Sequence, residues 1–117
     1  MKPPVEVVPS SLFIQRVKQL RKRYRHIRED LRPFIEQLEQ GQTPGDRVRA
    51  KNHIVYKARL PNRDAQRGKS GGYRVIYYIQ TGNRIILLTI YAKSDRVDIG
   101  LDEIQAIITD LPEEDAK

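Results

Sequence analysis

The stretch VYKARLPNRDAQRGKSGGYRVIYYI, residues 55–79, contains two strand-like runs separated by a basic, glycine-rich loop. In the first run, residues 54–60, apolar side chains alternate with Lys57 and Arg59, as in a strand with one buried face. In the second run, residues 73–79, Arg74 and Tyr78 share one face. If the two runs pair as antiparallel strands, Arg74 lies near Lys57 and Arg59.

The segments before this pair predict an edge strand and two helices. Residues 5–8 form a short extended segment that ends at Pro9, and Ser10 or Ser11 suits the N-cap of a helix. Apolar residues recur at helical spacing over residues 13–27 and again over 31–38. A break near residues 24–28 makes a helical hairpin, and the second helix either starts close to Pro33 or begins near Ile27 and bends. Residues 41–46 read as a loop.

The segments after the pair predict a turn, a strand and a last helix. Residues 81–83 form a hairpin turn, and the apolar run over 84–93 indicates a central strand covered on both faces. The last helix starts at Asp98 or Gly100, and its apolar side includes Leu101. The predicted order is strand, two helices, three antiparallel strands, helix. This is an α+β fold with a small, curved antiparallel sheet of about four strands.

Length and composition predict a single domain over residues 1–117 with no membrane partner. The chain has no cysteine, so neither disulfides nor thiolate metal sites are available. His26 and His53 are isolated, and we expect no metal and no cofactor. The longest apolar run, residues 85–91, is far shorter than a membrane span. A cytoplasmic protein is the simplest interpretation, and the net charge of +7 predicts an anionic partner.

The positive charge gathers around residues 55–79. Lys57, Arg59 and Arg74 on one sheet face repel one another unless an anion sits among them, which favours a phosphate site and RNA over a merely solvated face. The loop segment RGKSGGYR is not a P-loop, because Arg63 stands where the first glycine is required and a strand follows. Further candidates for RNA contact lie in the loop, on the strands and on the back of the first helix: Arg63, Arg67, Lys69, Tyr78, Lys93, Arg21 and Lys22.

Taken together, several segments resemble the RelE/ParE toxin superfamily, and most closely its RelE- and HigB-like branch. They are FIQRVKQLRKRY with REDL, GDRV, VYKARL, RGKSGGYRVIYY, LLTIYAKSD and DEIQAII, in this order along nearly the whole chain. The resemblance implies the toxin of a bacterial type II toxin–antitoxin system. Such a toxin enters the ribosomal A site and cuts mRNA, and a cognate antitoxin masks its site.

The resemblance also implies site residues. Lys57 and Arg59 match the two basic residues of the first site strand, and Arg74 matches the arginine of a Tyr-Arg signature. Lys93 lies where the family often places a further cation, and Lys69 belongs to a Gly-Lys-x-Gly-Gly loop. No tyrosine occurs in residues 95–99, where RelE-type enzymes often carry one, so the general base is unassigned.

The expected reaction is attack of the RNA 2′-hydroxyl on the adjacent phosphate, without a metal. Arginines stabilise the charge on phosphorus, and a lysine among other cations, Lys57, Lys69 or Lys93, transfers protons. Asp95 orients a cation, serves as a base or only terminates its strand. Three alternatives stay open: a ParE-like DNA gyrase inhibitor, a non-catalytic RNA- or ribosome-binding module, and an inert member kept for regulation with its antitoxin.

Overall fold

The computed structural model describes residues 4–65 and 72–112 and confirms the α+β class. Five strands form one sheet in the order β1-β5-β4-β3-β2. The elements, in chain order, are β1 (Glu6–Pro9), α1 (Ser11–Arg21), α2 (Ile27–Glu39), β2 (Asp46–Ala50), β3 (His53–Leu60), β4 (Tyr73–Thr81), β5 (Arg84–Ala92) and α3 (Leu101–Thr109).

The sheet has one strand more than predicted and is mixed. Strands β2 to β5 are antiparallel neighbours, whereas β1 is the predicted edge strand and pairs parallel with β5. The unpredicted strand is β2, which forms the other edge and reaches β3 through a two-residue turn with Asn52 at φ 65°. Its sequence, DRVRA, is mostly charged, because only Val48 and Ala50 pack against the core.

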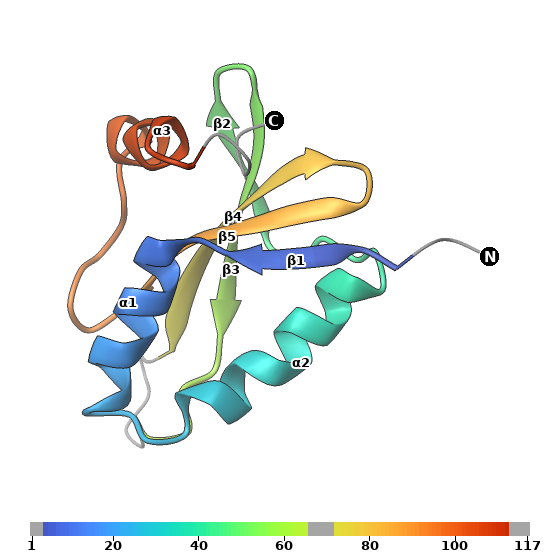
Figure 1. Cartoon of the computed structure of the whole chain (residues 1–117). Coiled ribbons are helices and arrows are strands. Elements are labelled where there is room, and N and C mark those ends of the chain that lie inside the picture. Colours follow the sequence, from blue (N-terminus) through green and yellow to red (C-terminus); the bar gives the residue numbers. More distant parts are fainter. Residues whose placement is uncertain (1–3, 66–71, 113–117) are drawn as a thin grey trace.

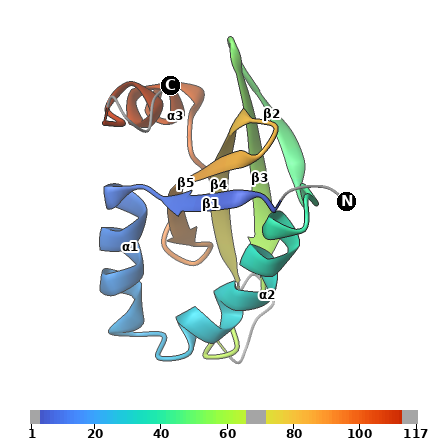
Figure 2. The same cartoon turned by 45° about the vertical axis from the view of Figure 1, so that its right-hand side comes forward.

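The sheet is the middle of three layers (Figures 1 and 2). Helices α1 and α2 cover one face, where their apolar stripes pack on alternate residues of β3, β4 and β5. Helix α3 covers part of the other face. Residues 85–92 of β5 are all buried, which confirms the prediction of a strand covered on both sides. None of these helices is long and apolar enough to cross a membrane.

The start of α1 is fixed to the sheet by one buried hydroxyl. Ser10 is the N-cap, and its Oγ accepts a hydrogen bond from the backbone N–H of Phe13 at 3.0 Å. The same Oγ donates to the carbonyl of Leu88 in β5 at 2.8 Å. A polar group in this position satisfies one free helix donor and one strand carbonyl together.

Helices α1 and α2 form the predicted pair, but they diverge from their connection instead of lying side by side (Figure 1). Each helix packs its own stripe on the sheet, so the contact with the sheet sets their directions. Helix α2 begins at Ile27 and runs through Pro33. This confirms the predicted alternative in which the second helix begins near Ile27, and not the one in which it starts close to Pro33.

The face under α3 is divided into an apolar half and a cationic half. Along β3 the side chains on this face are Val55, fully buried, then Lys57 and Arg59, which is exposed. Helix α3 packs over the Val55 end through Ile104 and Ile108, while Leu101 at the start of the helix is 51% exposed, against the prediction. The end of the sheet that α3 leaves uncovered carries the cations.

Two glycines let neighbouring segments press on β3 beside these cations. Gly45 has φ 101°, and a Cβ there would lie 2.3 Å from the carbonyl oxygen of Lys57. Gly72 has φ 97°, and a Cβ there would lie 2.5 Å from the carbonyl oxygen of Leu60. Gly72 thereby lets the chain turn tightly into Tyr73 at the start of β4.

We expect Ser10→Ala to destabilise the protein by about 1–3 kcal/mol, because it removes the cap and leaves the Leu88 carbonyl buried without this donor. The midpoint of urea unfolding, at unchanged m-value, measures the loss. Ser11→Ala is the matched control, since Ser11 is exposed and is expected to change stability by less than about 0.5 kcal/mol. Equal midpoints for the two variants would contradict the role of Ser10.

Candidate functional site

Three adjacent strands place two arginines and a tyrosine in one row. In the antiparallel register Arg59 of β3 lies opposite Arg74 of β4, and Arg74 lies opposite Tyr91 of β5. Directly opposed residues in such pairs have Cα atoms about 5 Å apart. The predicted proximity of Arg74 to the first strand is therefore confirmed. The Arg74 guanidinium donates to its neighbouring carbonyl, that of Tyr73, at 3.3 Å.

Lys57 lies on the same face, two residues before Arg59, and it has a carboxylate partner. Its Nζ donates to Oδ1 of Asp98 at 2.8 Å. The Lys57 side chain is 32% exposed and that of Asp98 is 59% exposed, so the pair is at the surface. The pKa of the Asp98 carboxyl is below its ordinary value, first because Lys57 donates to it and then because the backbone N–H of Ile99 does.

Tyr91 connects this carboxylate to the arginine row. Its hydroxyl lies 3.5 Å from Oδ1 of Asp98, and the guanidinium of Arg96 stands over its ring at 5.4 Å. Burial raises the pKa of Tyr91, and the charge of Asp98 raises it further. The hydroxyl therefore stays protonated at neutral pH. Arg96 is held in turn by two hydrogen bonds to Glu103 of α3, at 3.1 and 2.8 Å.

The loop between β5 and α3 folds back on itself beside the row. The backbone N–H of Lys93 continues the sheet ladder to the carbonyl of Gly72, and its Nζ donates to the carbonyl of Val97 at 3.0 Å. Asp95 forms an ion pair with Arg23, beyond the end of α1. Of the roles considered for Asp95, the structure shows the orientation of a cation.

Tyr78 shares the Arg74 face but lies away from the row. Tyr78 lies four positions after Arg74 along β4, which is about 13 Å at strand rise. Tyr78 packs under the α3 side, and its ring meets that of His53 edge-on, with centroids 5.3 Å apart. In the structure Tyr78 is half-buried and packs against the core on this face.

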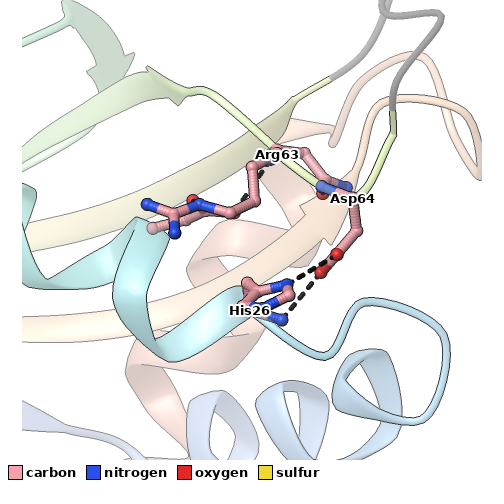
Figure 3. A network of polar contacts seen from close by, with 5 residues as sticks. His26, Arg63 and Asp64 are labelled. Atoms are coloured by element: carbon pink, nitrogen blue, oxygen red, sulfur yellow. Dashed lines mark hydrogen bonds and ion pairs between the residues drawn. The ribbon is translucent and has the colours of Figure 1, made fainter.

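Arg63 turns to the opposite side of the sheet (Figure 3). Its backbone N–H and its Nε donate to the carboxylate of Asp30, a buried residue of α2, at 3.1 and 3.2 Å. Next to it, Asp64 accepts from the backbone N–H of His26 at 2.7 Å and contacts its ring at 2.8 Å. The start of the loop is thus fastened to α2, and Arg63 does not join the strand cations.

The end of α1 and the start of α2 carry a separate basic surface. Here a hollow of about 420 Å³ is lined by Lys18, Arg21, Lys22 and Arg28. The two helix residues predicted to contact RNA, Arg21 and Lys22, therefore lie together. Arg67 and Lys69 fall outside the described residues.

The sequence interpretation missed the role of Asp98 and Arg96 in this site. It also did not assign a role to Tyr91. Register alone would have placed Tyr91 beside Arg74, whereas no local pattern marks Asp98, which reaches Lys57 because its loop closes over the strand. In the described ranges, His, Asp and Glu side chains do not gather in groups of three that could hold a metal ion.

The family follows from a comparison with known proteins. The model of the family described as "RelE toxin of RelE / RelB toxin-antitoxin system" matches residues 13–110. This chain belongs to the RelE toxin family. The match includes all of the strand row, the following loop and α3, and a search of curated proteins gives no match. The RelE-family chain is accordingly the toxin of a toxin–antitoxin pair, and an antitoxin is its partner.

We expect an NMR titration to place the pKa of Asp98 below about 3.9 and Lys57→Met to raise it. Because the folded pKa is the lower one, the pair contributes stability above about pH 4, which is lost as the pH falls through the folded pKa. Lys51→Met, in the turn at the far end of β3, is the control and leaves the pKa unchanged. An equal effect of both variants would contradict the specific role of Lys57.

Proposed function

We propose that this toxin is a ribosome-dependent endoribonuclease that cleaves mRNA in the cytoplasm until its cognate antitoxin neutralises it. The observation that supports this most is the row Arg59–Arg74–Tyr91 with Lys57 beside it. It concentrates phosphate-binding groups on rigid strands, on the part of the sheet that α3 does not cover. The family match supports the identification as a toxin, and the row of arginines supports the proposed cleavage of a phosphodiester.

The row suits the stabilisation of a pentavalent phosphate. Arginine presents parallel N–H groups that match two phosphate oxygens, and Arg59 and Arg74 approach from neighbouring strands. Two like charges held directly opposite each other destabilise a sheet. An anion that binds both relieves this repulsion, and it does so most as charge develops on phosphorus in the transition state.

Lys57 is the third member of the proposed catalytic set, and Lys93 is the fourth. The Nζ of Lys57 donates to Asp98 at 2.8 Å, and the same group suits donation of a proton to the departing 5′-oxygen. Lys93 stands at the end of the β4–β5 ladder and extends the positive edge toward the loop. We further propose that the antitoxin covers this face with acidic or apolar segments.

Arg74→Ala is expected to slow mRNA cleavage in a translating extract by at least about 100-fold, because one donor to the transition state is lost. Arg49→Ala is the matched control: Arg49 is an exposed arginine of the edge strand β2 and lies outside the proposed site. Far-UV circular dichroism and the melting temperature verify that both variants fold. Cleavage by Arg74→Ala at the control rate would remove Arg74 from the mechanism.

The basic helix surface is expected to act on affinity and not on the chemical step. Charge reversal at Arg21 and Lys22 should weaken ribosome binding and reduce the slope of log K against log salt concentration, since fewer counterions are released. Co-sedimentation with ribosomes at several salt concentrations measures both quantities. An unchanged slope would exclude this surface from the contact.

The same assays separate the other functions. Ribosome binding that leaves the mRNA intact would identify a non-catalytic module. Toxicity accompanied by DNA damage at gyrase, with intact mRNA, would identify a gyrase inhibitor. For the proposed nuclease we expect loss of mRNA when the toxin is expressed.

A further inference from the structure

Attack by the 2′-hydroxyl needs an acceptor for its proton. Lys57 and the two arginines of the row are poorly suited to accept it. Lys57 would have to be neutral, yet its proton is held in a 2.8 Å hydrogen bond to Asp98. Arginines do not deprotonate in proteins. The acceptor is therefore to be sought among the carboxylates at this end of the sheet.

We propose that Asp98 is the general base, and that its Oδ2 accepts the proton of the ribose 2′-hydroxyl; this rests on the proposed nuclease function. All three hydrogen bonds to the carboxylate reach the other oxygen, Oδ1. They come from Lys57, from the backbone N–H of Ile99 and from Tyr91, at 2.8, 2.8 and 3.5 Å. Among the described residues no donor reaches Oδ2. One oxygen orients the group and the other faces solvent.

Two of the neighbouring carboxylates lack such an open oxygen, and a third lies away from Arg74. Glu103 gives both oxygens to the guanidinium of Arg96, and Asp95 gives both to Arg23. Asp46 of β2 lies opposite Lys57 in the register, but on the side of β3 away from β4. Asp98 alone among these four contacts strands on both sides of Arg74, namely β3 through Lys57 and β5 through Tyr91.

The proton account closes through the Lys57–Asp98 pair and water. The 2′-oxygen loses its proton to Oδ2 and forms a bond to phosphorus, while the bond from phosphorus to the 5′-oxygen breaks. Lys57 gives a proton to the departing 5′-oxygen. The products are a 2′,3′-cyclic phosphate and a 5′-hydroxyl. Asp98 then loses the proton from Oδ2 to water and Lys57 takes a proton from water, so both residues regain their starting charge.

The charges around Asp98 make its basicity responsive to substrate. Lys57 from β3 and Tyr91 from β5 act on it directly, while Arg96 donates to its backbone carbonyl at 3.0 Å. Asp46 and Glu103 are the nearest acids on β2 and α3. A bound phosphate competes for the Lys57 ammonium and adds negative charge beside Asp98, and both effects raise the affinity of the carboxylate for a proton.

The test measures single-turnover cleavage of mRNA positioned on purified ribosomes with saturating toxin, from pH 6 to pH 8. Asp98→Asn is expected to be about 100- to 10,000-fold slower than the wild type. Its rate should rise about tenfold per pH unit, because hydroxide then replaces the base, whereas the wild-type rate is nearly flat. Asp46→Asn, which removes the other acid beside Lys57, should cleave at the wild-type rate and with the wild-type profile.

Each result decides between distinct causes. Cleavage by Asp98→Asn at the wild-type rate overturns the proposal, as does a slowing by one constant factor at every pH, which indicates that Asp98 only positions Lys57. If the asparagine variant unfolds, Asp98→Ser gives the same test, since its hydroxyl can accept from Ile99 without acting as a base. If the wild-type toxin binds ribosomes and leaves mRNA intact, the proposed nuclease function itself is contradicted.

Discussion

The pairing of β3 with β4 sets Arg59 opposite Arg74 on one face of the sheet, and the site depends on this register. Two opposed arginines oppose the pairing, so the strands must be held by their other face and by the remaining residues of this one. Both conditions are met, because Ala58, Tyr73 and Val75 are buried beneath the helices α1 and α2, and Val55 and Ile76 are buried on the face of the arginines. The apolar packing on one side of the sheet therefore maintains a charge arrangement that would not persist on an isolated hairpin.

The protein places its own anion among these cations. Asp98 binds Lys57, and its loop is bound to itself and to α3 through Arg96. Such a surface ion pair contributes little stability, since both groups remain hydrated. Its consequence is chemical, because it sets the orientation of the Asp98 carboxylate beside Lys57. The position of α3 thus affects the site through Arg96, although no hydrogen bond or ion pair joins the described residues of α3 to Arg59 or Arg74.

The sequence was sufficient to predict the class of fold and the cations that share one face of the strands. Alternation over residues 54–60 and 73–79 reports burial directly, so it revealed which face Lys57, Arg59 and Arg74 share. Strand β2 was missed because it is only five residues long and has only two apolar side chains, Val48 and Ala50. Asp98 was missed because its contact with Lys57 is made across 41 residues by loop closure. The position of Arg63 was not predicted for a related reason. Its charge predicts an anionic partner, and in the structure this partner is the buried carboxylate of Asp30.

A positive sheet face is by itself consistent with binding an RNA and with cutting one. The net charge and the basic helix surface bring a polyanion to the protein in either case. Cleavage demands in addition a group that takes up a proton at neutral pH, close to groups that carry positive charge. In the proposed mechanism this group is the carboxylate of Asp98, which is bound through one oxygen beside Lys57 and Tyr91. The feature proposed to distinguish a phosphate-cleaving site from a phosphate-binding one is therefore a carboxylate that contacts the strands on both sides of Arg74, and not the number of cations.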